Sequence, residues 1–235
     1  MRWVLLPGMD GVGLFQPLME VLGPQQDCLV LSYPADLPLG YEQLMVRVRE
    51  LLREETDYIL VAESFSGPIA IALAAENPPG LRALVLAASF CRAPVHGLKA
   101  RLLKKFGGAL FRIRPPLWAV KHFLLGDAAS QQMIDDLYAA ISRVSAETLN
   151  YRLREILNVN VCNHCAEILV PVLYLQAIGD RLVGQQEAEI IQHSCQQFEL
   201  HQIDASHMVL QRQPALSCSA IKDFLSHHKI FPAQP

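Results

Sequence analysis

Long apolar runs are missing from this chain of 235 residues. Its longest apolar segments, LVLAASF and VPVLYLQAI, are far shorter than the roughly 18 residues that a membrane-spanning helix requires. Charged side chains are also few, at 18%, whereas 51% of the residues are hydrophobic, which is the opposite of a disordered composition. We therefore expect a compact domain, with or without an insertion, and no membrane span.

We expect no secretory signal in the first residues either. Residues 1–11 hold a short apolar stretch that leads directly into a glycine turn, without the longer apolar region and cleavage site of a signal peptide. In that context the six cysteines indicate reduced thiols and a cytoplasmic location. The segment Cys162-Asn163-His164-Cys165 has the spacing of half a zinc site, but no second half is nearby. We predict no metal and no other cofactor.

Acidic residues are absent from residues 91–125, although the whole chain carries 23 of them. The same segment holds eight basic residues, Arg92, Lys99, Arg101, Lys104, Lys105, Arg112, Arg114 and Lys121. Such segregated charge forms either a solvated helix face or an attractive surface for an acidic partner. No Walker lysine, H-E-x-x-H motif or basic-aromatic pattern accompanies it, so nucleotide, metalloprotease and nucleic-acid functions are not indicated.

Six short, nearly continuous apolar runs alternate with helical patterns along the chain. We place strands at residues 2–7, 27–33, 57–63, 82–88, 170–178 and 197–203. Apolar runs of this length, separated by amphipathic helices, are typical of βαβ units and of a parallel sheet that is buried on both faces. The predicted fold class is therefore α/β.

The gap between the fourth and fifth predicted strands is too long for a βα connection, whose loops usually span about 2–6 residues. Helical patterns occupy it at residues 98–106, 116–125, 130–142 and 146–157, with expected breaks at Gly107-Gly108 and Pro115-Pro116. We therefore divide the chain into a core domain, residues 1–90 and 169–235, and a helical cap (lid) insertion, residues 91–168.

Ser64 lies where a buried apolar strand changes abruptly into a helix of small residues. A serine on such a strand-turn-helix elbow is a typical nucleophile, because the turn exposes its hydroxyl and the helix N-terminus faces developing negative charge. The positions two before and two after it must be small, and they are Ala62 and Ser66, where glycine is usual. Glu63 directly precedes the nucleophile, and we expect its side chain to point away from it.

A serine hydroxyl needs a base, and the base needs an acid that orients it. Asp180 follows the fifth predicted strand and His207 follows the sixth, so both belong at the carboxyl edge of the sheet, where ligands bind. Their order along the chain, Ser64, Asp180 and His207, is the order of the α/β-hydrolase triad. The rival acid Asp204 precedes His207 by only three residues, and we interpret it as a turn residue.

Acyl transfer also needs donors for the oxyanion. We expect these to be the backbone N–H groups of Phe65, directly after the nucleophile, and of Met9 in the turn after the first strand. The alternative, a dinucleotide-binding turn, is not supported, because Gly8, Gly11 and Gly13 lack the G-x-G-x-x-G spacing.

The segments LPGMDG, AESFSG, GDRLV and SHM together resemble the motifs of the α/β-hydrolase superfamily, over nearly the whole chain. The resemblance implies a three-layer fold of about six parallel strands, without the first two strands of the family, and with a helical cap. Pro7 stands where many members carry histidine. Within the superfamily, the cap insertion resembles that of small carboxylesterases, such as the pimeloyl-acyl-carrier-protein methyl ester esterases.

These features predict a serine hydrolase that cleaves carboxylic esters through an acyl-serine intermediate. The substrate we expect is a small ester with an apolar acyl group, contacted by Trp118 and Phe123 of the cap. The basic residues Lys104, Lys105 and Arg112 would favour an acidic acyl carrier protein as partner. Thioesterases and acyltransferases use the same triad, and a non-catalytic ligand-binding protein of this fold is a further alternative.

Overall fold

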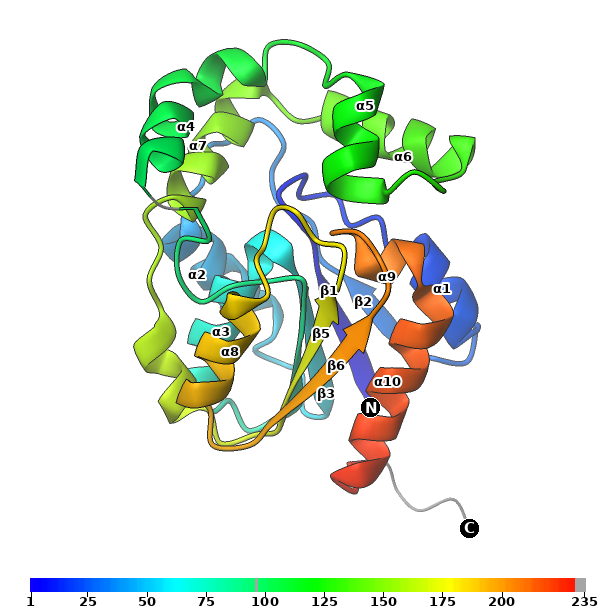
Figure 1. Cartoon of the computed structure of the whole chain (residues 1–235). Coiled ribbons are helices and arrows are strands. Elements are labelled where there is room, and N and C mark those ends of the chain that lie inside the picture. Colours follow the sequence, from blue (N-terminus) through cyan, green and yellow to red (C-terminus); the bar gives the residue numbers. More distant parts are fainter. Residues whose placement is uncertain (96, 231–235) are drawn as a thin grey trace.

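The computed structural model describes residues 1–95 and 97–230 (Figure 1). Its centre is a six-stranded sheet in the order β2-β1-β3-β4-β5-β6, and every neighbouring pair is parallel. The strands are β1 (Arg2–Leu6), β2 (Cys28–Val30), β3 (Tyr58–Glu63), β4 (Leu81–Ala87), β5 (Val172–Ala177) and β6 (Phe198–Ile203). The α/β class and the six parallel strands predicted from the sequence are thereby confirmed.

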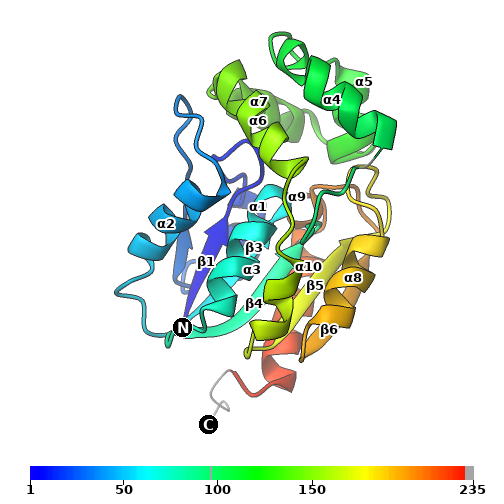
Figure 2. The ribbon, with the colours of Figure 1, turned by 90° about the vertical axis from the view of Figure 1, so that its left-hand side faces the viewer.

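Both faces of the sheet are covered by helices, which makes three layers (Figures 1 and 2). The helices α2 (Tyr41–Leu51), α3 (Gly67–Ala75) and α8 (Gln186–Ser194) cover one face, and α1 (Gln16–Leu22), α9 (Val209–Arg212) and α10 (Pro214–His227) cover the other. Alternate residues of a strand point to opposite faces, so Leu60 packs in one hydrophobic core and Val61 in the other. This double burial explains why β3 is apolar almost throughout.

Further helices lie above the carboxyl ends of the strands (Figure 1). They are α4 (Gly97–Leu110), α5 (Leu117–Val120), the π-helical turn η2 (Lys121–Leu125), α6 (Gln131–Ser142) and α7 (Ala146–Ile156). Serine side chains begin two of them, since Ser130 accepts a hydrogen bond from Met133 N and Ser145 from Thr148 N. A 3₁₀ segment, η3 (Cys162–Glu167), packs beside the sheet against α3 and α8. The division into core and cap at residues 91 and 168 stays a prediction.

Helix α4 continues through Gly107 and Gly108, so the predicted break at these residues is wrong. The reason is packing against α7. A Cβ at Gly107 would lie 2.6 Å from a methyl carbon of Leu153 on α7, which means that the glycine lets the two helices approach closely. Tertiary contact therefore outweighs the low helix propensity of the glycine pair.

Cys91 and Cys162 form a disulfide, so the prediction of reduced thiols is wrong for this pair. The chain leaves the sheet after β4 and returns to it before η3 as two antiparallel segments, in which Val161 N donates to Cys91 O at 2.7 Å. That pairing brings the two Cα atoms to 5.0 Å, within the range for a disulfide. Four cysteines are free, namely Cys28, Cys165, Cys195 and Cys218. The cytoplasmic location stays a prediction.

Within residues 1–95 and 97–230, no helix is both long enough and apolar enough to cross a bilayer.

Candidate active site

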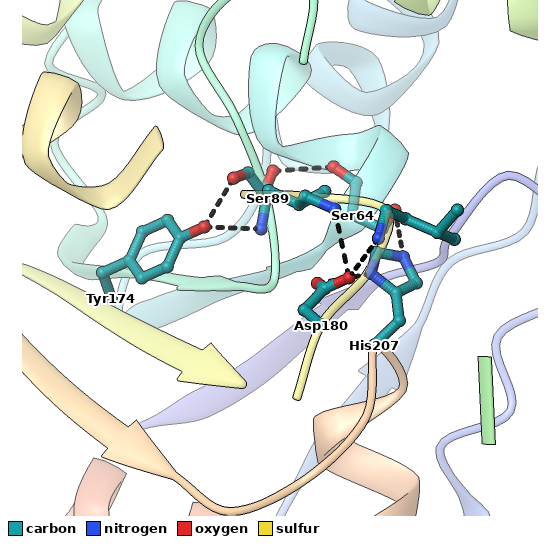
Figure 3. A network of polar contacts seen from close by, with 7 residues as sticks. Ser64, Ser89, Tyr174, Asp180 and His207 are labelled. Atoms are coloured by element: carbon teal, nitrogen blue, oxygen red, sulfur yellow. Dashed lines mark hydrogen bonds and ion pairs between the residues drawn. The ribbon is translucent and has the colours of Figure 1, made fainter. Parts of the chain in front are cut away.

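Ser64 stands on a strained turn between β3 and α3. Its φ is +48°, a left-handed value that is uncommon for a residue with a side chain. Ser89 holds this turn, because its Oγ donates to Ser64 O at 2.6 Å, while the Tyr174 hydroxyl donates to Ser89 O at 2.6 Å (Figure 3). A Cβ at Gly67 would lie 1.7 Å from Ser89 Oγ, so the turn requires glycine there. These contacts therefore stabilise the strained backbone conformation of Ser64.

The three predicted triad residues lie in one hydrogen-bonded row (Figure 3). His207 Nε2 is 2.8 Å from Ser64 Oγ, and His207 Nδ1 is 2.7 Å from Asp180 Oδ2. The second carboxylate oxygen, Asp180 Oδ1, accepts hydrogen bonds from Leu182 N at 2.8 Å and Val183 N at 3.0 Å. The side chains of His207 and Asp180 are 7% and 3% exposed. Such a row lets a histidine accept the serine proton while the carboxylate fixes its tautomer.

Opposing influences act on the pKa of His207. Burial lowers it, whereas the charge and hydrogen bond of Asp180 raise it, and the charge of Glu63 adds to the rise. The net result is a pKa above the ordinary histidine value. An imidazolium formed next to Asp180 is therefore favoured, which is the form that follows proton transfer from a serine.

Glu63 is buried beneath the site, and its Oε2 accepts a hydrogen bond from Gln211 Nε2 at 3.1 Å. Burial, with a smaller contribution from the charge of Asp10, raises its pKa to about 7. From the sequence, Glu63 was expected to point away from the nucleophile and had no predicted role. The available signal was a carboxylate inside an otherwise apolar strand, which is rare unless the group has a partner.

The turn that carries Met9 is closed by a hydrogen bond from Gly11 N to Gly8 O at 3.0 Å. Asp10 Oδ1 accepts from Val12 N at 2.8 Å and from Gly13 N at 3.2 Å, which holds the exit of the turn. The turn follows β1 directly, and β1 is the neighbour of β3 in the sheet. The oxyanion role of Met9 N–H and Phe65 N–H stays a prediction.

The residues predicted to contact a substrate or partner lie on or directly after helices above the carboxyl ends of the strands: Lys104 and Lys105 on α4, Arg112 after it, Trp118 on α5 and Phe123 on η2. Trp118 is 68% exposed, and Phe123 packs edge-on against the His122 ring with centroids 4.7 Å apart. Lys104 Nζ donates to Asn158 Oδ1 at 2.6 Å. Lys105 and Arg112 are exposed as well. Their roles in binding a substrate or a partner stay predictions.

A cavity of about 470 Å³ lies in the cap and includes Arg112 among its lining residues. The Arg114 side chain, also in the lining, lies over the Tyr138 ring at 3.7 Å from the centroid. None of the three triad residues lines this cavity.

The turn η2 of the cap is hydrogen-bonded to the loop that carries His207. Leu124 O accepts a hydrogen bond from Met208 N at 3.1 Å, directly after His207 in the chain. Close by, Arg181 Nη1 and both ring nitrogens of His122 are within hydrogen-bond distance, and Arg181 follows Asp180 directly. These contacts could not be predicted from local sequence patterns, because they join segments that are remote in the chain.

Among the described residues, one group of three side chains has the ligand types and proximity to hold a metal ion. Glu199, His227 and His228 offer atoms that all lie within 4.8 Å of one another. Glu199 lies near the start of β6, so the group is at the opposite end of the sheet from Ser64. It takes no part in the row of Ser64, His207 and Asp180.

The three-layer fold, the elbow at Ser64 and the row of serine, histidine and aspartate define an α/β hydrolase. The chain belongs to the serine aminopeptidase S33 family, whose model matches residues 40–211. A comparison with curated proteins finds no match.

Solved structures of hydrolases share the fold at low sequence identity. A hydrolase from Oleispira antarctica has a TM-score of 0.80 at 12% identity, over 96% of this chain and 90% of that one. An esterase from Exiguobacterium antarcticum has a TM-score of 0.78 at 12% identity, over 96% and 92%. An enol-lactonase from Burkholderia xenovorans LB400 has a TM-score of 0.76 at 17% identity, over 96% and 91%. These structures share the fold, and the family match over residues 40–211 confirms the predicted superfamily.

Proposed function

We propose that this protein is a serine hydrolase that cleaves carboxylic esters through an acyl-serine intermediate. The observation that carries the proposal is the row in which His207 Nε2 is 2.8 Å from Ser64 Oγ and His207 Nδ1 is 2.7 Å from Asp180 Oδ2. At the first distance the histidine can accept the proton of the serine. At the second, the carboxylate can orient the histidine ring.

In the first half of the reaction, His207 Nε2 takes the proton of Ser64 as Oγ attacks the ester carbonyl carbon. The carbonyl π electrons move to oxygen, and the N–H groups of Met9 and Phe65 donate to the resulting oxyanion. When the tetrahedral intermediate collapses, the bond to the alcohol oxygen breaks and His207 gives its proton to the leaving alkoxide. The products are a free alcohol and an acyl ester of Ser64.

In the second half, water replaces the alcohol. His207 takes a proton from the water while the water oxygen attacks the acyl carbon, and a second oxyanion forms at the same place. Collapse of this intermediate breaks the bond to Ser64 Oγ, which receives the proton back from His207. Asp180 holds Nδ1–H and stabilises the imidazolium in both steps.

For the substrate, we propose a small ester with an apolar acyl group, in contact with Phe123. Support comes from Leu124, the next residue, whose carbonyl bonds to Met208 beside His207. Trp118 is 68% exposed, so we assign it to the outer rim of the same segment. Phe123→Ala should lower kcat/KM for hexanoate esters more than for acetate esters. An equal effect on both would argue against an acyl contact.

A carrier-linked ester, such as an acyl-carrier-protein methyl ester, is the finer form of this proposal. It is supported by the absence of acidic residues from residues 91–125. Reversal of Lys104, Lys105 and Arg112 to Glu should weaken turnover of the carrier-linked ester and spare small esters, with Lys222→Glu on α10 as control. An equal effect on both substrates would reject the carrier.

Cleavage of thioesters, acyl transfer to an alcohol, and cleavage of the amide bonds on which an aminopeptidase acts can all use the same nucleophile. They are distinguished by comparing 4-nitrophenyl esters, thioesters and aminoacyl 4-nitroanilides as substrates at one enzyme concentration. We expect the esters to give the highest kcat/KM. A preference for the anilides by tenfold or more, about 1.4 kcal/mol of barrier, would replace the ester assignment with a peptidase.

The decisive experiment is Ser64→Ala with 4-nitrophenyl butyrate. We expect loss of turnover and of covalent labelling by a fluorophosphonate, with the thermal unfolding temperature retained. Ser219→Ala, on the surface of α10, is the matched control and should behave as the wild type. Full turnover in Ser64→Ala would overturn the assignment. A wild-type chain that neither turns over esters nor reacts with the probe would favour the non-catalytic ligand-binding alternative.

A further inference from the structure

The side chain of Arg152 passes from the cap into the protein interior beside the Met9 turn. Arg152 lies on α7 and is 0% exposed. Its Nη1 donates to Met9 O at 2.8 Å and its Nη2 donates to Pro34 O at 2.8 Å. One guanidinium thus joins a cap helix to two loops of the core, and one of these carries the proposed oxyanion donor.

A buried guanidinium is costly unless its surroundings compensate for it. Burial lowers the pKa of Arg152, but the negative charge of Asp10 and the phenol of Tyr33 work in the opposite direction. Arg152 Nε has no hydrogen-bond partner among the described protein atoms. An arginine remains protonated under such conditions, so the interior holds a positive charge directly behind the Met9 turn.

The turn is shaped to admit this side chain. Gly11 has a φ of +72°, and a Cβ there would lie 2.6 Å from Arg152 Nη1. The glycine therefore provides both the left-handed backbone and the space for the guanidinium. Glycine at positions 8 and 11 also leaves the turn with much conformational freedom, which the hydrogen bond to Met9 O restricts.

We propose that Arg152 is a positioning residue for the oxyanion turn, fixing Met9 through its carbonyl so that Met9 N–H points at the developing oxyanion. This inference rests on the proposed hydrolase function. The Met9 carbonyl and N–H flank the same Cα, so restraint of the carbonyl limits the rotation of the N–H. The positive charge behind the turn also favours negative charge in front of it. A misplacement of about 1 Å at such a donor costs up to about 100-fold in rate.

The test compares Arg152→Met, which removes the charge and both hydrogen bonds, with Arg152→Lys, which keeps a charge but not the two-pronged donor. Arg154→Met is the matched control, because Arg154 lies on the same helix and is exposed. Four quantities are measured for each variant: kcat and KM for 4-nitrophenyl butyrate, the inhibition constant of an alkyl trifluoromethyl ketone, and the thermal unfolding temperature. The ketone reports on the oxyanion donors, because it binds as a tetrahedral adduct of the serine.

We expect Arg152→Met to lower kcat by about 10- to 100-fold, with KM within twofold of wild type. The inhibition constant of the ketone should rise by a similar factor. Arg152→Lys should fall between, and Arg154→Met should match the wild type. An Arg152→Met variant that folds and keeps kcat and ketone affinity overturns the inference. If Arg152→Met fails to fold, the Arg152→Lys variant provides the test. Wild-type kcat and ketone affinity in that variant would reject the positioning role of Arg152.

The two proposals fail in different ways. An active wild type with an equally active Arg152→Met rejects the positioning role alone. A wild type without turnover or fluorophosphonate labelling rejects the hydrolase function, and the positioning role with it.

Discussion

The Tyr33 hydroxyl lies 2.6 Å from Ser66 Oγ, and the Ser66 hydroxyl in turn donates to the carbonyl of Pro7. A hydroxyl has one proton, so Tyr33 is the donor to Ser66. Both side chains are buried. Ser66 therefore replaces the usual glycine of the elbow without an unpaired polar group, and it joins the elbow to the first residue after β1.

Ser66→Ala should reduce the free energy of unfolding by about 1–3 kcal/mol, because it leaves the Tyr33 hydroxyl and the Pro7 carbonyl buried without this partner. Urea denaturation measures the loss. Tyr33→Phe combined with Ser66→Ala should cost less than the sum of the single changes, since the double variant removes both hydroxyls. The exposed Ser219→Ala should change the value by no more than about 0.5 kcal/mol. Strictly additive losses would show that the two hydroxyls are not coupled.

Asp180→Asn should lower kcat by about 10⁴-fold and leave KM nearly unchanged, because an amide no longer holds the histidine in the required tautomer. Steady-state kinetics with a 4-nitrophenyl ester measures both constants. Asp204→Asn is the comparison, because Asp204 is an exposed neighbour of His207 in the chain and was the rival acid. An equal loss of kcat in the two variants would argue against Asp180 as the acid that orients His207.

The acid limb of kcat/KM should have its midpoint above the ordinary histidine pKa, about 6.5, because His207 must be neutral to act as a base and its pKa is raised. Glu63→Gln should shift this limb to lower pH, since the charge of Glu63 contributes to the rise. A profile of kcat/KM from pH 5 to pH 9 checks both points. If Glu63→Gln leaves the acid limb at the same pH, the charge of Glu63 does not contribute to the raised pKa of His207.

Glu63 should also make the folded state less stable as the pH rises. Its pKa is raised from 4.5 to about 7, so the folded state holds the proton between these values while the unfolded state has released it. Stability is highest below pH 4.5 as far as this group is concerned, and it declines as the pH rises to 7. Full ionisation of Glu63 lowers the free energy of unfolding by about 3 kcal/mol.

Glu63→Gln removes this titration, so its unfolding free energy relative to wild type should rise from pH 5 to pH 8. Urea melts at both values measure the difference. Glu20→Gln, on α1, is a control from an exposed position. A Glu63→Gln variant whose relative stability is the same at pH 5 and pH 8 would contradict the raised pKa.

The disulfide of Cys91 and Cys162 should stabilise the folded chain by about 4 kcal/mol, because it closes a loop of 71 residues in the unfolded state. Thermal melts with and without dithiothreitol measure the contribution, and the paired variant Cys91→Ser with Cys162→Ser should be insensitive to the reductant. Thiol titration of the denatured chain should find four thiols before reduction and six after it, in agreement with the four free cysteines. Six thiols before reduction would show that the bond is absent from the purified protein.

Local patterns in the sequence were sufficient to predict the strands and the elbow. The run from Tyr58 to Glu63 is apolar almost throughout because both faces of β3 are buried, and such a run identifies a central parallel strand. The carboxyl ends of parallel strands meet at one edge of the sheet. Ser64, Asp180 and His207 each follow a strand within a few residues, so they could be placed together without any knowledge of distances.

Contacts between remote segments were outside the reach of such patterns. The sequence of α7 has an ordinary amphipathic pattern, in which Arg152 does not differ from the exposed Arg154 two residues later. Whether an arginine faces solvent or two backbone carbonyls depends on how the helix packs, and the same holds for the glycines of α4 against Leu153.

The sequence by itself determined the class of the fold, the order of the strands along the chain and the residues at the edge where the site lies, because these follow from local periodicity and strand ends. The tertiary structure alone decided three other features: the disulfide of Cys91 and Cys162, the burial of Glu63 against Gln211, and the position of Arg152 behind Met9. Each depends on the relative placement of segments that are far apart in the chain. A pair of thiols, a carboxyl group or a guanidinium acquires its chemistry from that placement rather than from its neighbours in sequence.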